Sequence, residues 1–168
     1  DCDWSSDVCS SDLSLEPPRL EGTWYQLAAL PSRADAHCDS DTQWQLQADA
    51  DGLAWNTRCL DRDGQVHQRS AHLRPDPVGQ GARWQARGPR TWSVATWVLA
   101  MGPGDRWALV GDPGRREAWL VARRTWLPPT DWDAAWQAAE QQGFTRQDFR
   151  VSAQFGRTEG PPPAPRPR

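Results

Sequence analysis

The stretch GTWYQLAAL, residues 22–30, has the composition of a β-strand, yet it begins with a glycine and places a tryptophan two positions later. Gly22 has no side chain to pack, whereas Trp24 carries one of the largest apolar surfaces that a residue can bury. The stretch predicts a strand, but strand propensity alone does not explain this beginning.

Outward from this strand, short segments rich in Trp, Leu and Val recur about every 11 to 19 residues, with turn sequences such as DADG, DRDG and DPG between them. Eight strands are expected: 22–30, 42–48, 53–59, 66–73, 82–87, 92–101, 106–111 and 117–123. Most of the connections have the chemistry of hairpin turns, which makes successive strands antiparallel neighbours. The sequence therefore predicts an all-β fold, an eight-stranded antiparallel up-and-down sheet that closes into a barrel and leaves no exposed edge.

A helical pattern follows the eighth strand. The sequence PPTD at 128–131 predicts a helix start with Thr130 as N-cap, and Gly143 predicts its end. The apolar positions between them recur at helical spacing: Trp132, Ala135, Trp136 and Ala139. The nearby runs TWVLAM, RWALVG and AWLVAR are continuously apolar, which suits strands covered on both faces. One C-terminal α-helix is therefore expected on the outside of the barrel.

The chain of 168 residues suits one domain with a formal net charge of −3, and all 19 of its cations are arginines. No basic stripe is present, so a nucleic-acid partner is not expected. Residues 1–18 are expected to be a non-native or disordered leader, because DCDWSSDVCSSDL (1–13) resembles translated sequencing-adapter sequence. Residues 156–168 form a proline-rich tail that is expected to be disordered, which leaves 19–155 as the domain.

The side chains that line the barrel can be inferred by pairing strands through their turns. Tight turns set Trp119 opposite Ala108, and Ala108 opposite Leu99. The inward face, and hence a candidate ligand cavity, then consists of Trp44, Leu46, Trp55, Trp84, Trp97, Leu99, Ala108, Val110, Trp119 and Val121. A register slip of one residue would exchange inward and outward sets. The alternative to a cavity is a barrel interior filled by its own tryptophans.

Three segments of the chain resemble the signature regions of the lipocalin family: Gly22-Thr23-Trp24-Tyr25, Ala108-Leu109-Val110-Gly111-Asp112-Pro113 and Trp119-Leu120-Val121-Ala122-Arg123. The likeness runs over about residues 19–155, is weakest over 66–90, and is closest to bacterial outer-membrane lipocalins related to apolipoprotein D. The chain departs from the family at Gln26, where Glu is usual, and at 122–125, where a Ser-Arg-Thr-Pro run is usual.

The resemblance implies an explanation for the opening stretch. In lipocalins the tryptophan of the first signature closes one end of the barrel, an arginine from the last strand packs over its ring, and the glycine lets the incoming chain cross beneath. Trp24 and Arg123 would form this cation–π contact, worth about 0.5 to 2 kcal/mol, with Gly22 beside them. The alternative is that Trp24 is ordinary core and Arg123 an exposed charge.

The resemblance also implies the function: binding and transport or storage of a small hydrophobic ligand, such as a fatty acid or lysophospholipid, with no cofactor and no catalysis. The loops at 31–41, 60–65, 88–91 and 112–116 would ring the open mouth. About a dozen buried methylenes would contribute on the order of 10 kcal/mol before ordering costs. The bacterial relatives imply a periplasmic or outer-membrane location, with a lipid anchor on a missing N-terminal segment, and a monomer or weak dimer is expected.

Cysteine positions add one structural prediction. Cys38 lies in the first mouth loop and Cys59 at the mouth end of the third strand, so a disulfide between them is expected, in an oxidising compartment. Two free thiols are the alternative, and Cys59 could then act on a bound lipid as an enzyme. An interaction module with a filled barrel is a third possibility. His37, His67 and His72 lack metal-ligand spacing, so no metal site is expected.

Overall fold

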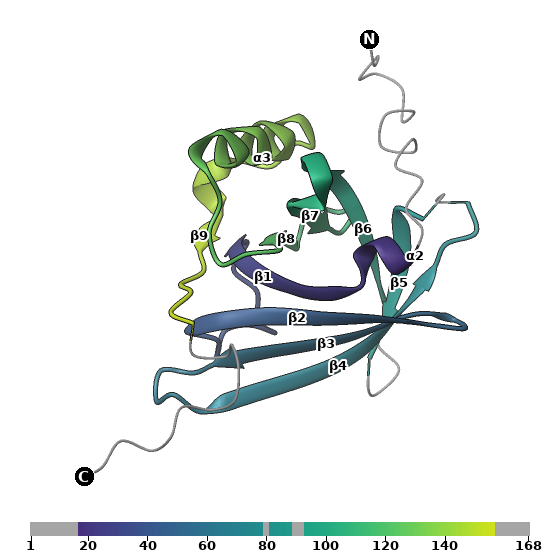
Figure 1. The fold of residues 1–168 in the computed structure, drawn as a ribbon, viewed down its shortest axis with the longest axis horizontal. Helices are drawn as coiled ribbons and strands as arrows, with labels where there is room; N and C mark the ends of the chain where they lie inside the picture. The colour runs from purple at the N-terminus through teal and green to yellow at the C-terminus, as the bar shows by residue number, and fades with distance from the viewer. Residues whose placement is uncertain (1–16, 79–80, 89–92, 157–168) are drawn as a thin grey trace.

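Figure 1 shows the fold in a computed structural model, which describes residues 17–78, 81–88 and 93–156. The expectations for the leader up to residue 16, for the tail from 157 and for residues 89–91 of the mouth lie outside the described residues. Within them, no helix is long and apolar enough to cross a membrane.

All eight expected strands are present, with ends within two residues of the prediction where both ends are described. They are β1 (Gly22–Ala29), β2 (Ser40–Asp49), β3 (Gly52–Leu60), β4 (Val66–Pro75), β5 (Arg83–Arg87), β6 (Ser93–Met101), β7 (Trp107–Gly111) and β8 (Ala118–Ala122). Each strand pairs antiparallel with the next, and β1 pairs with both β8 and β2. The predicted closed barrel is thereby confirmed (Figure 1).

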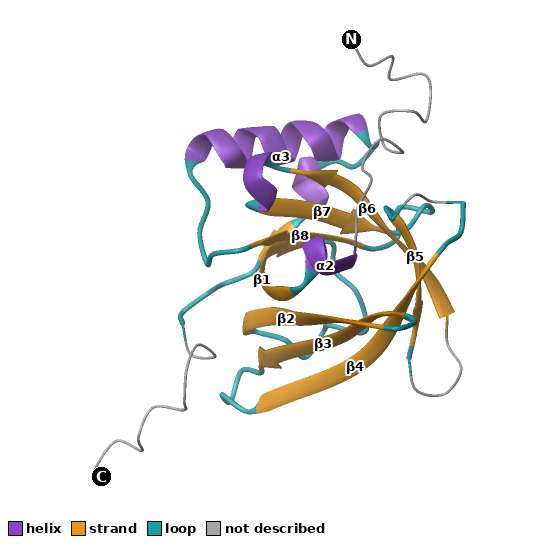
Figure 2. Ribbon diagram, turned by 45° about the vertical axis from the view of Figure 1, so that its right-hand side comes forward, coloured by secondary structure: helices purple, strands orange, loops and turns teal. Residues whose placement is uncertain are grey.

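The predicted helix is α3 (Pro129–Gln141), which lies outside the barrel over β7 and β8, on the side away from β3 and β4 (Figure 2). It buries Ala135, Trp136 and Ala139 in an apolar layer with the outward side chains of β7 and β8. The predicted N-cap is wrong by two residues, because Pro128 occupies that position. Pro129 disfavours helical geometry at the residue before it and suits the first helical position itself.

The short elements were not predicted. A helical turn, α2 (Pro17–Leu20), precedes β1, and two 3-10 turns follow β6 and α3: η2 (Pro103–Asp105) and η3 (Arg146–Asp148). Arg106 beside η2 holds Asp131 of α3 through two hydrogen bonds of 2.8 Å. This ion pair ties the start of the helix to the closed end of the barrel.

A C-terminal strand completes the wall at the mouth. β1 and β2 pair only near the closed end of the barrel, where residues 22–25 of β1 lie opposite residues 43–46 of β2. Farther along, β9 (Arg150–Val151) pairs with the end of β1. Gln154 Nε2 then donates to the backbone carbonyls of Gln26 and Thr42, at 2.9 and 2.8 Å, and so bridges the two strands. The C-terminal segment thus fills the gap where β1 and β2 separate.

Strand β6 carries a bulge that changes which side chains face inward. Val98 pairs with Val110 and Met101 pairs with Ala108, so the two residues between Val98 and Met101 oppose a single residue of β7. An extra residue in one strand reverses the alternation of its side chains beyond that point. The turn-based register assumed regular alternation along β6 and therefore failed there.

The expectation that Trp97 and Leu99 line the interior is wrong for this reason. Trp97 lies on the outer face, where the guanidinium carbon of Arg83 sits 4.4 Å from its ring centroid. Leu99 packs against the apolar layer beneath α3. Before the bulge, the residues of β6 that face the interior are Val94, Thr96 and Val98, and beyond it Met101 packs against the interior cluster.

Candidate functional site

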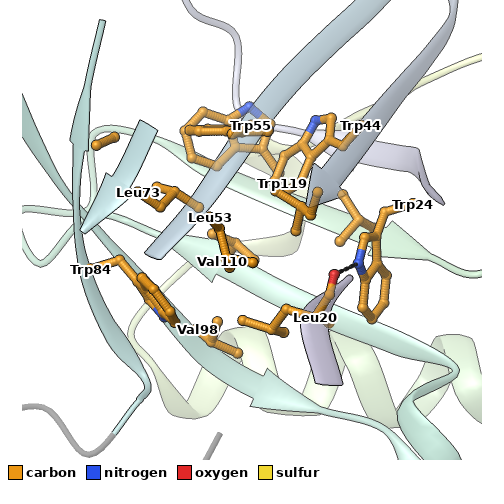
Figure 3. Close-up of a cluster of buried hydrophobic side chains, with 14 of the residues drawn as sticks. Leu20, Trp24, Trp44, Leu53, Trp55, Leu73, Trp84, Val98, Val110 and Trp119 are labelled. Atoms are coloured by element: carbon orange, nitrogen blue, oxygen red, sulfur yellow. Dashed lines mark hydrogen bonds between the residues drawn. The ribbon is translucent and has the colours of Figure 1, made fainter. Parts of the chain in front are cut away.

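The closed end of the barrel is built around Trp24, which is 1% exposed. The guanidinium carbon of Arg123 lies 3.7 Å from the ring centroid, so the expected cation–π contact is present. The indole Nε1 donates to the Leu20 carbonyl at 2.9 Å (Figure 3). The α2 turn therefore lies with Trp24 across the closed end of the barrel and is hydrogen-bonded to its side chain.

Arg123 also fastens the incoming chain. Its Nη1 donates to the carbonyls of Glu21 (2.7 Å) and Thr23 (3.3 Å), and its Nη2 donates to the Arg19 carbonyl (3.0 Å). Gly22 sits between these contacts with φ +101°, and a Cβ atom there would lie 3.3 Å from Arg123 Nη1. The glycine is needed because the guanidinium approaches a backbone in a conformation that L-residues rarely adopt.

The interior next to this end is packed. Its side chains include Leu20, Trp24, Leu46, Leu73, Trp84, Val98, Ala108, Val110 and Val121, of which Figure 3 labels most. Only about 30 Å³ of space remains among them. Filling by the chain's own side chains, the alternative to a cavity, therefore holds for this half of the barrel.

Three tryptophans divide this packed half from the mouth. Trp44, Trp55 and Trp119 meet edge to face, with ring centroids 4.9, 5.7 and 5.8 Å apart (Figure 3). Each is at most 6% exposed. Edge-to-face packing is a favoured arrangement of aromatic pairs. We call this group the tryptophan floor.

Above the tryptophan floor lies a cavity of about 270 Å³, here called the mouth cavity. Strands β3 to β6 and β8, the first mouth loop and the turn between β7 and β8 line it with Ala34, Trp55, Thr57, Arg69, Ser70, Ala71, Ala86, Val94, Thr96, Glu117 and Trp119. Of the ten residues expected to line a cavity, only Trp55 and Trp119 border this one. The remaining inward-facing ones lie in the floor or below it.

The sequence prediction missed the charged groups at the mouth, of which Arg69 and Glu117 line the mouth cavity and Asp35 borders a small adjoining void. Asp35, in the first mouth loop, accepts hydrogen bonds from Arg69 Nη2 at 3.3 Å and from Trp119 Nε1 at 3.4 Å. Ser32 also donates its hydroxyl to Asp35, at 3.3 Å. The first mouth loop is thereby held over the cavity by the Asp35–Arg69 ion pair and by the hydrogen bond from Trp119 of the tryptophan floor.

Glu117 is the acidic residue that lines the mouth cavity, and it is half-buried. Burial raises the pKa of its carboxyl group, and the nearby charges of Asp35 and Asp112 raise it further. Arg69 opposes this shift in pKa. The rim of the mouth cavity therefore carries one cation, Arg69, and one carboxyl group, that of Glu117, whose charged form is disfavoured.

The predicted disulfide joins Cys38 of the first mouth loop to Cys59 of β3, with Cα atoms 5.5 Å apart. Cys59 is 2% exposed. A cysteine in a disulfide has no thiol to act as a nucleophile, so the bonded form leaves the enzyme hypothesis based on Cys59 without its reactive group.

Comparisons with known proteins agree with the barrel fold described above. A family model described as a lipocalin-like domain matches residues 15–154. Lobster apocrustacyanin A1 superimposes with a TM-score of 0.71 at 13% identity, covering 88% of this chain and 84% of that one. Insecticyanin from the tobacco hornworm Manduca sexta gives 0.68 at 14% identity, with 83% and 80% covered. The cockroach allergen Per a 4 gives 0.65 at 12%, with 84% and 90% covered. A search of curated protein sequences found no match.

Proposed function

The chain belongs to the lipocalin family, and from this premise we propose that it binds and carries a small hydrophobic ligand in the mouth cavity. Lipocalin barrels are suited to holding one small ligand in their interior. The observation that supports this most is the mainly apolar cavity of about 270 Å³ above the tryptophan floor. Its volume is near the lower end of the range for small-molecule sites, which favours a small ligand or the end of a longer one.

A fatty acid or lysophospholipid is the ligand class of this proposal. The packed half of the barrel favours entry of only the terminal part of the acyl chain, with the head group at the rim. About six buried methylenes would contribute roughly 5 kcal/mol before ordering costs. Because Glu117 lines the rim near Arg69, a zwitterionic head group suits the site better than a bare carboxylate.

The proposal includes an oxidising location, the periplasm or the outer membrane, as in the bacterial relatives of the initial resemblance. The Cys38–Cys59 bond supports an oxidising compartment, because disulfides persist there and are rare in reducing cytosol. A monomer or weak dimer carrying one ligand per chain is part of the same proposal. Stable self-association that persists with ligand bound would instead favour an interaction module.

A tryptophan-fluorescence titration tests ligand binding. Lysophosphatidylethanolamine and the fatty acid of the same chain length are added to the folded protein, and saturable quenching by one ligand per chain is expected. Ala71→Phe, on an inward position of β4, should abolish it by filling the cavity. Arg74→Phe, on an exposed position of the same strand, is the matched control and should bind normally. Absence of saturable quenching with both lipids would refute the proposal.

A further inference from the structure

A cluster of metal-ligating side chains surrounds the disulfide at the mouth. The sulfur atoms of Cys38 and Cys59 and a ring nitrogen of His37 all lie within 4.8 Å of one another. The ring of His67 is next to that of His37, with centroids 4.6 Å apart. These residues also border one small void of about 30 Å³ beside the mouth cavity.

The topology explains why four residues that are far apart in sequence meet here. Cys59 and His67 are directly paired across β3 and β4, which puts their side chains on the same face as close neighbours. Cys38 and His37 reach the same point from the first mouth loop, whose Asp39 N–H donates to the Leu60 carbonyl at 2.8 Å. The sequence spacing gave no signal because the cluster joins a loop to a strand pair.

His67 is oriented as a metal-binding histidine would be. Its Nε2 lies 2.8 Å from Asp61 Oδ2, and Asp61 also accepts the N–H groups of Asp63 and Gln65. An ionised carboxylate can only accept hydrogen bonds, so Nε2 carries the proton and a neutral ring keeps its lone pair on Nδ1. Carboxylates behind metal-bound histidines commonly fix the ring in this way.

We propose that His37, Cys38, Cys59 and His67 form a Zn²⁺ site that is available only when the Cys38–Cys59 disulfide is reduced. A dithiol reductant gives up two electrons and two protons to the disulfide, which becomes two thiols while the reductant becomes a disulfide. Zn²⁺ then displaces the two thiol protons and binds two thiolates and two imidazoles. This set is a common tetrahedral zinc ligation, in which ligand atoms lie about 3.3 to 3.8 Å apart. His37, Cys38 and Cys59 already place their ligand atoms within 4.8 Å of one another, and the His67 ring has to move to complete the set.

The consequence is a mouth loop held in two chemically different ways. In the oxidised protein the disulfide ties the loop to β3, and in the reduced protein the metal takes over that role. The proposal does not depend on what the mouth cavity binds, because the four residues that would hold Zn²⁺ border the adjoining void and not the mouth cavity.

Metal binding is measured on the full chain in a Cys2→Ser, Cys9→Ser background, so that the two cysteines of the leader add no thiols. The reduced protein is titrated with Co²⁺, whose tetrahedral thiolate complexes absorb strongly in the visible, and then with Zn²⁺ in competition. One ion per reduced chain is expected, and none that binds tightly to the oxidised chain. Asp61→Asn should lower the affinity about 10- to 100-fold, as removal of an outer-shell partner does.

Histidine variants make the test specific. His37→Ala and His67→Ala should each weaken Zn²⁺ binding at least about 10-fold, since each removes a ligand. His72→Ala is the matched control, because His72 is on the same strand and its Nε2 contacts Asp49 at 2.8 Å in the same manner. If reduction abolishes the near-UV circular dichroism, equimolar Zn²⁺ should restore it. The proposal is overturned if no thiolate–Co²⁺ band forms, if Zn²⁺ fails to restore a lost fold, or if both ligand-removing histidine variants bind like the control.

Discussion

Replacing Arg123 by methionine tests the closure of the barrel. The change keeps an unbranched side chain over Trp24 but removes the cation–π contact, worth about 0.5 to 2 kcal/mol. It also removes the donor for three backbone carbonyls. Water can replace that donor at this half-buried position, so each of these bonds contributes about 1 kcal/mol or less. The expected loss in unfolding free energy is about 2 to 4 kcal/mol, or about 4 to 16 °C in Tm for a chain of this size.

The assay is urea unfolding followed by tryptophan fluorescence under non-reducing conditions. Arg124→Met is the matched control, because Arg124 is the exposed neighbour of Arg123, and its replacement should change stability by less than about 0.5 kcal/mol. Ligand affinity should be unchanged in both variants, since the mouth cavity is at the opposite end. If the two variants are equally stable, Arg123 does not close the barrel and the reasoning from Gly22 and Trp24 fails.

Three further predictions concern the mouth and the helix. Because Glu117 has a raised pKa in the folded chain, stability falls as pH rises from about 4.5 through the folded value, and Glu117→Gln should remove this fall in a series of urea midpoints against pH. Replacing Cys38 and Cys59 by serine should cost about 3 kcal/mol of unfolding free energy in a non-reducing urea titration, the loop-closure contribution for about 20 residues. Arg106 lowers the pKa of Asp131, so their contribution is present above about pH 3.8 and lost in acid; Arg106→Met should be less stable than wild type at pH 7, with a gap that closes on acidification.

The sequence was sufficient for the strand order and the closed end, because both depend on local signals. Turn residues delimit the hairpins, and the Gly22–Trp24 pair with Arg123 resembles a family pattern that the structure reproduces. The β6 bulge and the C-terminal strand β9 were not predictable in this way. A bulge depends on how two strands pack rather than on either one, and β9 is a two-residue element that forms only because β1 and β2 separate.

The candidate site was predicted only in part. The alternation of side chains along β4 puts Arg69 on the same face as Ala71 and Leu73, so the position of Arg69 could be predicted from the sequence. The roles of Asp35 and Glu117 could not be read from the sequence, because neither belongs to the regular alternation of a strand. Asp35 contacts the cavity residue Arg69 from a loop, and Glu117 reaches the cavity from a turn. Whether a tryptophan fills the barrel interior or lines a cavity depends on how deep in the barrel its side chain lies. The sequence does not determine that depth.

A crystal structure with a fatty acid that carries bromine on its terminal carbon tests the central claim most directly, because anomalous scattering locates the end of the chain. The account predicts one bromine peak in the mouth cavity, in contact with Trp55 and Val94 and above the tryptophan floor. A bromine peak below the floor, beside Trp24 or Leu73, or no peak inside the barrel at saturating ligand, would contradict it.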